Sequence, residues 1–192
     1  MSGAQCCSNP PILNPSSGAG HVQKLGGLDS YVSGSPNSNL AVLLVTDIFG
    51  YETPNVRKLA DKIAAAGFFV AVPDFLHGDP YPNDDFCRIA VWLKDHGTDK
   101  VFEEAKPVIE DLKTKVVTEL AKFDNFIQAA ALLYPTFITV DDIKEVKVPI
   151  AILGAEIDNA SQPELVKQFE DVLSVKPKID YFVKIYPGVR HG

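Results

Sequence analysis

The amino-acid sequence predicts an α/β protein with a mostly parallel sheet flanked by helices. The first observation is an apolar run over residues 40–45, which has the length and composition of a strand buried on both faces. The second is the order of the next segments: a polar turn at residues 46–50, a helical pattern over residues 54–67 and another apolar strand over residues 68–72. Strand, helix and strand in this order form a crossover unit, which places functional loops at the carboxyl ends of its strands. These two loops are residues 46–50 and residues 74–79.

Most of the chain before the predicted helix of residues 54–67 is expected to lie at the periphery of the fold. Residues 1–20 are rich in proline, serine and glycine and are predicted to be irregular. Residues 21–33 alternate weakly around Gly26-Gly27, which is typical of two antiparallel strands joined by a tight turn at the edge of a sheet. Thr53 is predicted to cap the helix of the crossover unit.

A long loop and further helical segments are expected after the crossover unit. Residues 80–97 are predicted to be a lid-like loop with a short helix, in which Trp92 covers the core. Apolar positions over residues 98–115 follow helical spacing, and Pro107 is expected to bend or divide this segment. Helical character continues over residues 116–122.

Strands dominate the carboxyl-terminal part. Buried strands are predicted at residues 126–134 and 148–153, and a last strand at residues 181–186. Residues 163–173 are predicted to be an amphipathic helix. All these elements fit one domain over residues 1–192.

Composition limits the class of partner. The net charge of -7 and the lack of a basic block argue against nucleic acid and anionic membranes, and favour small molecules or proteins. No apolar run approaches the roughly 20 residues that span a bilayer, and the amino terminus has no apolar core of a secretory signal. Three cysteines suit a reducing compartment. We therefore expect a cytoplasmic protein, and the sequence leaves its oligomeric state open.

Two residues near the carboxyl end suggest catalytic chemistry. Asp158 lies in the loop after one late strand, and His191 lies in the loop after the next. Acyl-transfer hydrolases built on such sheets deliver nucleophile, acid and histidine in that order from successive loops. On spacing alone, Asp158 is equally an ordinary turn or capping aspartate, and His191 a solvated terminal residue.

Several motifs together give the chain a family resemblance. They cover most of its length: HVQKLGGLDSYVSG, LLVTDIFGYETPNVRKLADKIAAAGFFVAVPDFLHGDP, VWLKDHGTDK, AKPVIEDLK, VPIAILGAEID and the terminal HG. With them the sequence resembles the dienelactone hydrolase family, a branch of the α/β-hydrolases known also for carboxymethylenebutenolidases, and in particular its plant members.

The resemblance implies an α/β-hydrolase-type fold that hydrolyses a small ester or lactone without a metal or other cofactor. It implies that Asp158 orients the imidazole and that His191 is the general base. The backbone N–H of Ile48 is the implied oxyanion donor, a role worth about 2.7 to 4 kcal/mol where donors are fixed. Asp47 stands where bacterial members have a glutamate that pairs with the resting thiol, although it also suits a loop-capping role.

One part of the family pattern is missing. The family's nucleophile is a cysteine in a G-x-C-x-G elbow after a central strand, whereas here the flanking segments join directly at Lys115–Val116. None of Cys6, Cys7 and Cys87 has flanking glycines of this kind, and we expect Cys87 to be inert. The helix that comes after HG in the family is not in this sequence either. We therefore expect one central strand to be absent, at a cost of roughly 1 to 3 kcal/mol for each buried backbone group left unpaired.

Two functions are consistent with these observations. One is a dienelactone hydrolase-like ester or lactone hydrolase. The other is a catalytically inactive truncated or splice-variant member with at most a binding role, which the missing elbow favours for this chain. Plant relatives are sometimes labelled endo-1,3;1,4-β-glucanases, but glycoside cleavage normally needs two positioned carboxylates, and no such pair stands out.

The remaining histidines have no metal-binding pattern. His77 stands where bacterial members carry a substrate-binding arginine, and His96 lies in the lid-like segment. Neither has a carboxylate or cysteine at metal-ligand spacing in the sequence, so both are predicted to be surface residues.

Overall fold

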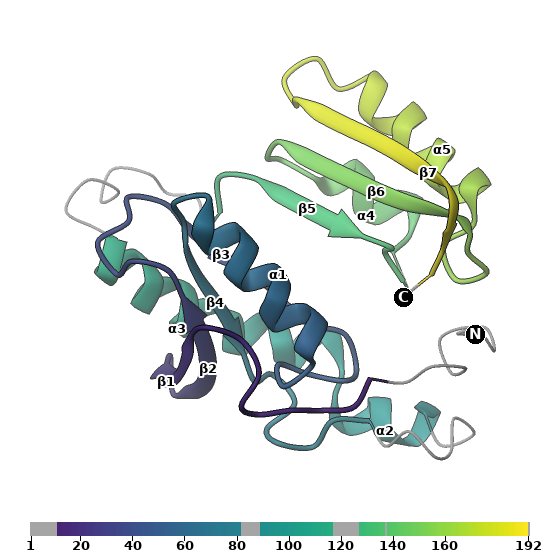
Figure 1. Ribbon diagram of the computed structural model, residues 1–192. Coiled ribbons are helices and arrows are strands. Elements are labelled where there is room, and N and C mark those ends of the chain that lie inside the picture. Colours follow the sequence, from purple (N-terminus) through teal and green to yellow (C-terminus); the bar gives the residue numbers. More distant parts are fainter. Residues whose placement is uncertain (1–10, 82–88, 117–126, 137, 192) are drawn as a thin grey trace. The chain divides into compact units, whose positions relative to one another are not determined.

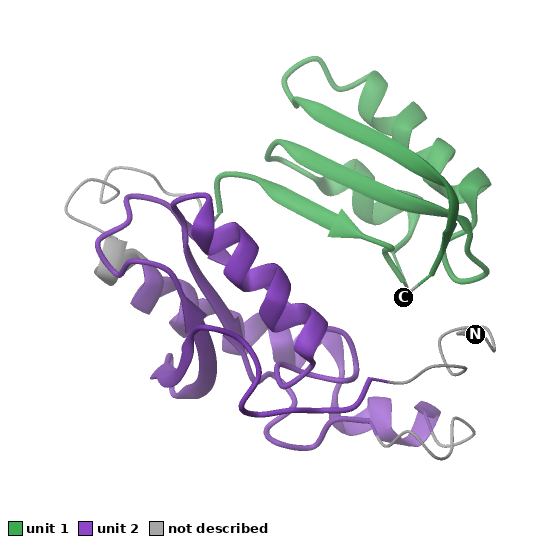
Figure 2. Ribbon diagram, viewed as in Figure 1, with its two compact units in different colours: residues 1–10, 125–192 green, residues 11–124 purple. Residues whose placement is uncertain are grey.

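The structure, a computed structural model, describes residues 11–81, 89–116, 127–136 and 138–191. The chain divides into two compact units, one of residues 11–124 and the other of residues 1–10 and 125–192 (Figure 2). Each unit contains a sheet with helices, so the predicted α/β class is confirmed (Figure 1). The prediction of one domain over the whole chain stays a prediction.

The unit of residues 11–124 contains a four-stranded sheet in the order β1-β2-β4-β3. Strands β1 and β2 form the predicted antiparallel hairpin, β2 pairs antiparallel with β4, and β3 pairs parallel with β4. The strands are β1 (His21–Leu25), β2 (Leu28–Ser33), β3 (Ala41–Leu43) and β4 (Phe69–Pro73). β4 is buried along its whole length, as expected for the middle of a layered unit.

Two helices form hydrophobic clusters with alternate residues of β4. Val70 and Val72 join a cluster with α1 (Pro54–Ala65), whereas Phe69 and Ala71 join another with α3 (Thr98–Val116). Successive strand residues point to opposite faces, so this alternation places the two helices on opposite sides of the sheet. The predicted short helix of the lid-like segment is α2 (Ile89–Asp95).

The hairpin turn has a packing role. Gly26 and Gly27 have φ of 55° and 87°, which glycine adopts without strain. A Cβ on Gly26 would lie 2.4 Å from the backbone nitrogen of Val108, so only glycine lets α3 approach this closely. The Gly26 N–H also donates to Asp111 of α3, at 2.6 Å. Helix α3 continues through Pro107, so of the two alternatives, a bend or a division, this proline does not divide the segment.

Arg57 of α1 holds the segment that precedes the hairpin. Residues 11–20 contain no helix or strand, as predicted, but Arg57 Nη1 donates to the carbonyls of Pro15 and Ser17, at 2.6 and 3.2 Å. Arg57 is 1% exposed, and its guanidinium lies over the rings of Tyr31 and Tyr51. This segment is therefore irregular but fixed to α1.

The other unit has a three-stranded parallel sheet in the order β5-β6-β7. Its strands are β5 (Ala130–Leu133), β6 (Ile150–Ile157) and β7 (Tyr181–Arg190), and its helices are α4 (Val140–Glu145) and α5 (Pro163–Ser174). Ile152 of β6 and Phe169 of α5 are fully buried in one cluster with Ile143 of α4. The sheet and both helices thus share one core.

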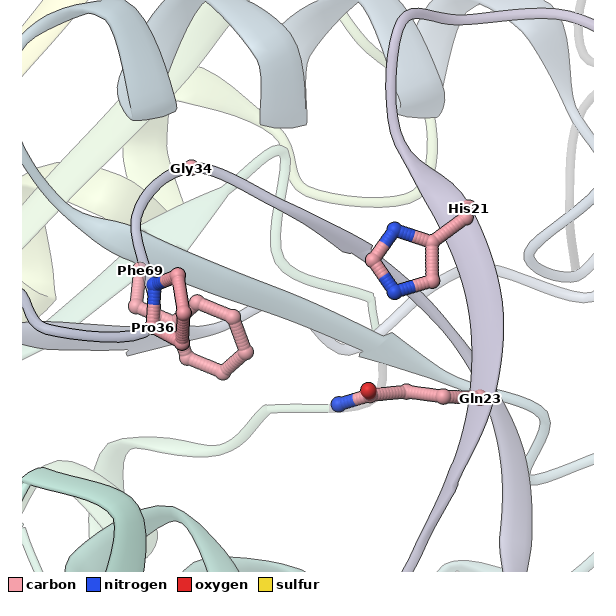
Figure 3. A pocket seen from close by; sticks show the side chains of 5 residues that line it. All are labelled: His21, Gln23, Gly34, Pro36 and Phe69. Atoms are coloured by element: carbon pink, nitrogen blue, oxygen red, sulfur yellow. The ribbon is translucent and has the colours of Figure 1, made fainter.

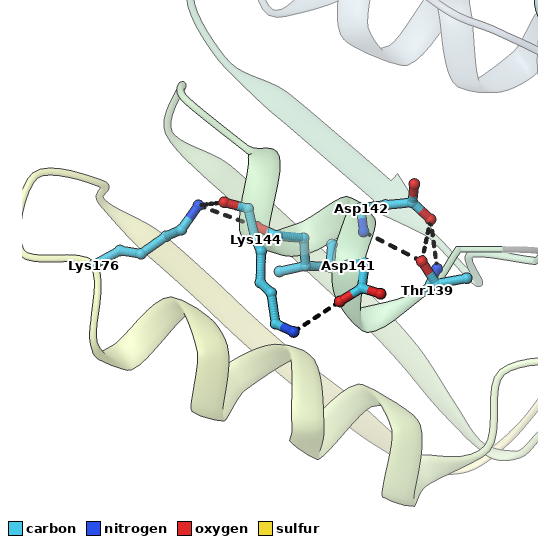
Figure 4. Close-up of polar contacts among 6 residues, drawn as sticks. Thr139, Asp141, Asp142, Lys144 and Lys176 are labelled. Atoms are coloured by element: carbon cyan, nitrogen blue, oxygen red, sulfur yellow. Dashed lines mark hydrogen bonds and ion pairs between the residues drawn. The ribbon is translucent and has the colours of Figure 1, made fainter.

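Polar contacts fix both ends of α4 (Figure 4). At its start, Thr139 accepts from the Asp142 N–H while the Asp142 carboxylate accepts from the Thr139 N–H, which is a capping box. At its end, Lys176 Nζ donates to the carbonyls of Ile143, Lys144 and Val146, the first and last at 3.2 and 2.9 Å. An ammonium group thus pairs the carbonyls that a helix leaves unpaired at its end.

Three expectations differ from the structure in detail. Thr53 is the N-cap residue of α1, as predicted, but its hydroxyl donates to the Gly50 carbonyl and makes no capping bond. β3 and β5 are only partly buried, and Leu133 of β5 is 48% exposed. β7 extends to Arg190, four residues beyond the predicted end. The prediction that a central strand is absent stays a prediction.

Candidate active site

Asp158 is placed by the end of β6. It comes directly after the strand, and its side chain is fully buried. Oδ1 accepts hydrogen bonds from the N–H groups of Ala160 and Ser161, at 2.8 and 2.9 Å, and so forms the turn that leads towards α5. These two donors satisfy the hydrogen-bonding capacity of a buried polar group.

His191 is placed by the end of β7. Its backbone N–H donates to the carbonyl of Ile157, the residue before Asp158, at 3.2 Å. Nδ1 lies 2.8 Å from Asp158 Oδ2, and the histidine side chain is 14% exposed. The two residues that the sequence singled out at the ends of separate strands are therefore in contact.

This contact defines what the pair can do chemically. An ionised carboxylate only accepts hydrogen bonds, so Nδ1 carries the proton that is shared with Asp158. In the neutral imidazole Nε2 is then the acceptor, and it can take a proton from an attacking group. This is the arrangement of the acid and base in acyl-transfer hydrolases.

Tyr134 also belongs to these surroundings, although the sequence did not single it out. It comes directly after β5, and its ring lies 6.1 Å from the His191 ring between centroids, in an edge-on arrangement at 60°. Its φ of 49° is unusual for a residue other than glycine, and such conformations concentrate at functional sites. The signal that could have found it is an aromatic residue at the end of a predicted strand.

Asp47 and Ile48 lie in the other unit, in the loop after β3. Asp47 Oδ1 accepts from the Phe49 N–H at 2.9 Å, so this side chain does cap its own loop. The Ile48 carbonyl accepts from the Tyr81 N–H at 2.8 Å. The Ile48 N–H has no acceptor among the described residues, and is thus available as a donor.

Two hollows are formed by described residues of the unit of residues 11–124. One, of about 290 Å³, is lined by His21 and Gln23 of β1, by Gly34 and Pro36 just after β2, and by Phe69 at the start of β4 (Figure 3). It contains none of the candidate residues. The other, of about 260 Å³, is lined in part by Phe49, Gly50 and Tyr51, directly after Ile48. The second hollow is the one next to a predicted functional loop.

His77 and His96 differ in how exposed their side chains are. His77 is exposed, as predicted, and pairs with Glu104 at 2.9 Å. The prediction for His96 was wrong: its side chain is 10% exposed, because its ring stacks on Trp92 with centroids 4.0 Å apart. Trp92 is half-buried and meets Tyr81 edge-on.

Neither a metal centre nor a membrane span is found in the part of the chain that the structure describes. These residues include no group of three or more histidine, cysteine, aspartate or glutamate side chains able to hold a metal ion. Within the same residues, no helix is long and apolar enough to cross a membrane. Cys6, Cys7 and Cys87 lie outside the described residues, as does most of the segment 116–122.

Parallel strands flanked by helices, with an acid after one strand in contact with a histidine after the next, are consistent with an α/β-hydrolase-type fold. The chain belongs to the dienelactone hydrolase family, whose sequence profile matches it in two segments, residues 28–123 and 114–192. The two matches overlap around the Lys115–Val116 junction.

Individual relatives agree with this family. The chain is 39% identical over 198 residues to an endo-1,3;1,4-beta-D-glucanase of Zea mays, an alignment that covers 93% of this chain but only 64% of the maize protein. It is 30% identical over 194 residues to a carboxymethylenebutenolidase homolog of Mus musculus, covering 91% of this chain and 79% of the mouse protein.

Solved structures share the fold. A crystal structure assigned to a dienelactone hydrolase of Klebsiella pneumoniae superimposes with a TM-score of 0.69 at 18% identity, covering 96% of this chain and 88% of that one. A cold-adapted esterase from an Arctic metagenomic library gives 0.61 at 14% identity, covering 94% and 91%. At these identities the similarity shows the fold alone.

Proposed function

We propose that the chain carries the acid and base of an ester or lactone hydrolase that acts on a small molecule. The observation that supports this most is the 2.8 Å contact between His191 Nδ1 and the buried Asp158 carboxylate. A turn aspartate needs no histidine partner, and a solvated terminal histidine is not 14% exposed. Membership of a hydrolase family supports the same function.

Each residue has a distinct role in this proposal. His191 takes the proton of the attacking group through Nε2 and later returns it to the leaving group. Asp158 holds the tautomer and stabilises the imidazolium that forms. In the other unit, Asp47 fixes the loop that contains Ile48, because its carboxylate accepts from the Phe49 N–H.

A second candidate, a catalytically inactive member with a binding role, is favoured by one specific observation. The sequence has no G-x-C-x-G motif, and the family profile matches in two segments that meet around Lys115–Val116, where the elbow is expected. Without the elbow, the acid and base lack the attacking thiol of the family. The maize relative's name suggests glycoside cleavage, which normally needs two positioned carboxylates. Here Asp158 already bonds the turn and His191, and we propose no second catalytic carboxylate.

Ester hydrolysis by the purified protein distinguishes the two functions. With p-nitrophenyl acetate, turnover should fall about 10²- to 10⁴-fold in Asp158→Asn and His191→Ala, the range that general acid–base catalysis contributes. Asp171→Asn, an exposed aspartate of α5, is the matched control and should keep its rate. A thiol-directed probe tests in parallel for a reactive cysteine. No turnover in the unchanged protein, with no reactive thiol, would contradict the hydrolase and leave binding.

A further inference from the structure

The pairing of β6 with β7 changes register just before the candidate site. From Ile150↔Tyr181 to Ala155↔Tyr186 the strands advance together, but the next pair is Ile157↔Arg190. Two steps along β6 thus correspond to four along β7. The additional residues of β7 form a bulge, and a bulge leaves backbone groups without their partners in the sheet.

Glu156 lies on β6 within this irregularity. Its side-chain Oε2 accepts a hydrogen bond from the Gly188 N–H at 2.6 Å. Pro187, the residue before, has no N–H, and Gly188 has a φ of 70° that favours glycine. The carboxylate therefore takes the place of a strand carbonyl at the point where regular pairing is interrupted.

The position of His191 depends on this bulge. After it, Arg190 pairs again with Ile157, and the His191 N–H bonds to the Ile157 carbonyl at 3.2 Å. A shift of one residue in a strand moves every side chain to the opposite face. A different number of residues in the bulge would therefore take the imidazole away from Asp158.

We propose that Glu156 is a positioning residue for His191: its side chain fixes the bulge around Gly188 and thereby sets the register that brings Nδ1 to Asp158. The functional meaning of this role rests on the proposed hydrolase function, whereas the geometry does not. The competing explanation is that Glu156 is an exposed acid whose contact leaves the register unchanged.

The side-chain NMR signals of His191 test the proposal in the full chain. A Nδ1 proton held by a buried carboxylate is strongly deshielded and exchanges slowly with water. In Glu156→Ala we expect this exchange to become about tenfold faster or the signal to disappear, since the loss of one hydrogen bond is of that order. Glu170→Ala, an exposed glutamate on α5, should leave the signal unchanged.

Two further variants separate the acceptor from the charge, and keep the test valid should Glu156→Ala fail to fold. Glu156→Gln keeps an acceptor oxygen at the same reach without charge, and should restore the signal. Glu156→Asp keeps the charge but withdraws the acceptor by one methylene, and should resemble Glu156→Ala. The proposal would be overturned if Glu156→Asp kept the signal while Glu156→Gln lost it, or if the signal were unchanged in all three variants. A Glu156 variant that loses turnover without any change of the His191 signal would overturn the proposal too. If the protein without substitutions has no turnover, only the hydrolase function is contradicted.

Discussion

At the scale of single residues, Asp158 shows that a structural and a functional role need not be alternatives. One carboxylate oxygen bonds the N–H groups of the turn, and the other bonds His191. The turn fixes the carboxylate plane, and this plane fixes the direction in which the imidazole is held. A residue of this kind is expected to affect stability and activity together when it is changed.

Asp61 of α1 is a second carboxylate with several partners, in a purely structural role. It accepts from the Tyr31 hydroxyl at 2.6 Å, the Ser33 hydroxyl at 2.8 Å and the Ala19 N–H at 2.8 Å. Burial raises the pKa of Asp61, but these hydrogen bonds outweigh it and hold the pKa below its ordinary value. For Tyr31, burial and the same bond to Asp61 raise the pKa.

These contacts predict how stability depends on pH. Because the folded-state pKa of Asp61 lies below the unfolded value near 3.8, its contribution is complete above that value and is lost as the pH falls through the folded-state pKa. Asp61→Asn should lower the free energy of unfolding by about 1 kcal/mol at pH 6, the net value of one hydrogen bond. The difference between the two proteins should shrink below about pH 4. Urea denaturation at a series of pH values measures it, and a difference that stays constant down to about pH 2 would contradict the assignment.

The sequence could identify Asp158 and His191 because each comes after a strand that an apolar run predicts. Tyr134 also lies at the end of a predicted strand, but no residue pattern linked it to catalysis. Glu156 was not accessible at all. Its role depends on a bulge in the backbone of β7, and no pattern of side chains encodes how many residues that bulge contains.

At the scale of elements, α4 is the helix that the sequence did not predict. Its six residues, Val140–Glu145, are too few to show an apolar period. Only the Thr139-x-x-Asp142 spacing indicated a helix start. The hydrogen bonds of Asp142 with the side chain and N–H of Thr139 lower the pKa of this aspartate. Such a short helix depends on its contacts rather than on intrinsic propensity.

Lys176 supplies the contact at the other end of α4, and Lys176→Met tests it. Methionine keeps an unbranched apolar chain but removes the ammonium group from the carbonyls of Ile143, Lys144 and Val146. We expect the free energy of unfolding to fall by about 1 to 3 kcal/mol, because hydrogen bonds to a charged group are lost and the carbonyls lose their partner.

Thermal and urea unfolding monitored by circular dichroism measure this effect. Lys178→Met removes an exposed lysine two residues further on and serves as the matched control. Equal stability of the two variants would show that water replaces Lys176 at these carbonyls without cost.

Strand lengths were predicted less well than strand positions. β3 and β5 are shorter than the apolar runs that predicted them: β3 ends at Leu43, before Val45, and β5 begins only at Ala130. β7 is longer, because its bulge carries the pairing past Pro187 and Gly188, which as sequence signals predict an end. Pairing partners, which the sequence does not show, decide both lengths.

At the scale of the whole molecule, both sheets end in a parallel strand. β3 and β5 each pair on one side only among the described residues. Parallel strands usually lie inside a sheet, and an open apolar edge is a template for pairing with another chain. Leu40, Val45 and Leu133, in or next to these strands, are 60%, 59% and 48% exposed.

These edges predict association that depends on concentration. Leu133→Lys places a charge on β5 and should reduce the mean mass at high concentration, because edge lysines oppose strand pairing. Light scattering coupled to size-exclusion chromatography measures the mass. The control is Val175→Lys, which replaces a 77% exposed apolar residue just after α5 and should have no effect. A monomer at all concentrations, or an equal effect of both variants, would contradict the role of the β5 edge.

The contacts of Arg57 have a consequence for how the protein responds to proteases. A segment without helix or strand is normally the first to be cleaved, because an extended backbone fits a protease cleft. In residues 11–20, however, the guanidinium holds the carbonyls of Pro15 and Ser17, and Asp61 holds the Ala19 N–H. To be cut, this backbone must first leave a buried cation without its partners. Resistance to digestion here would therefore report the integrity of α1 rather than any local secondary structure.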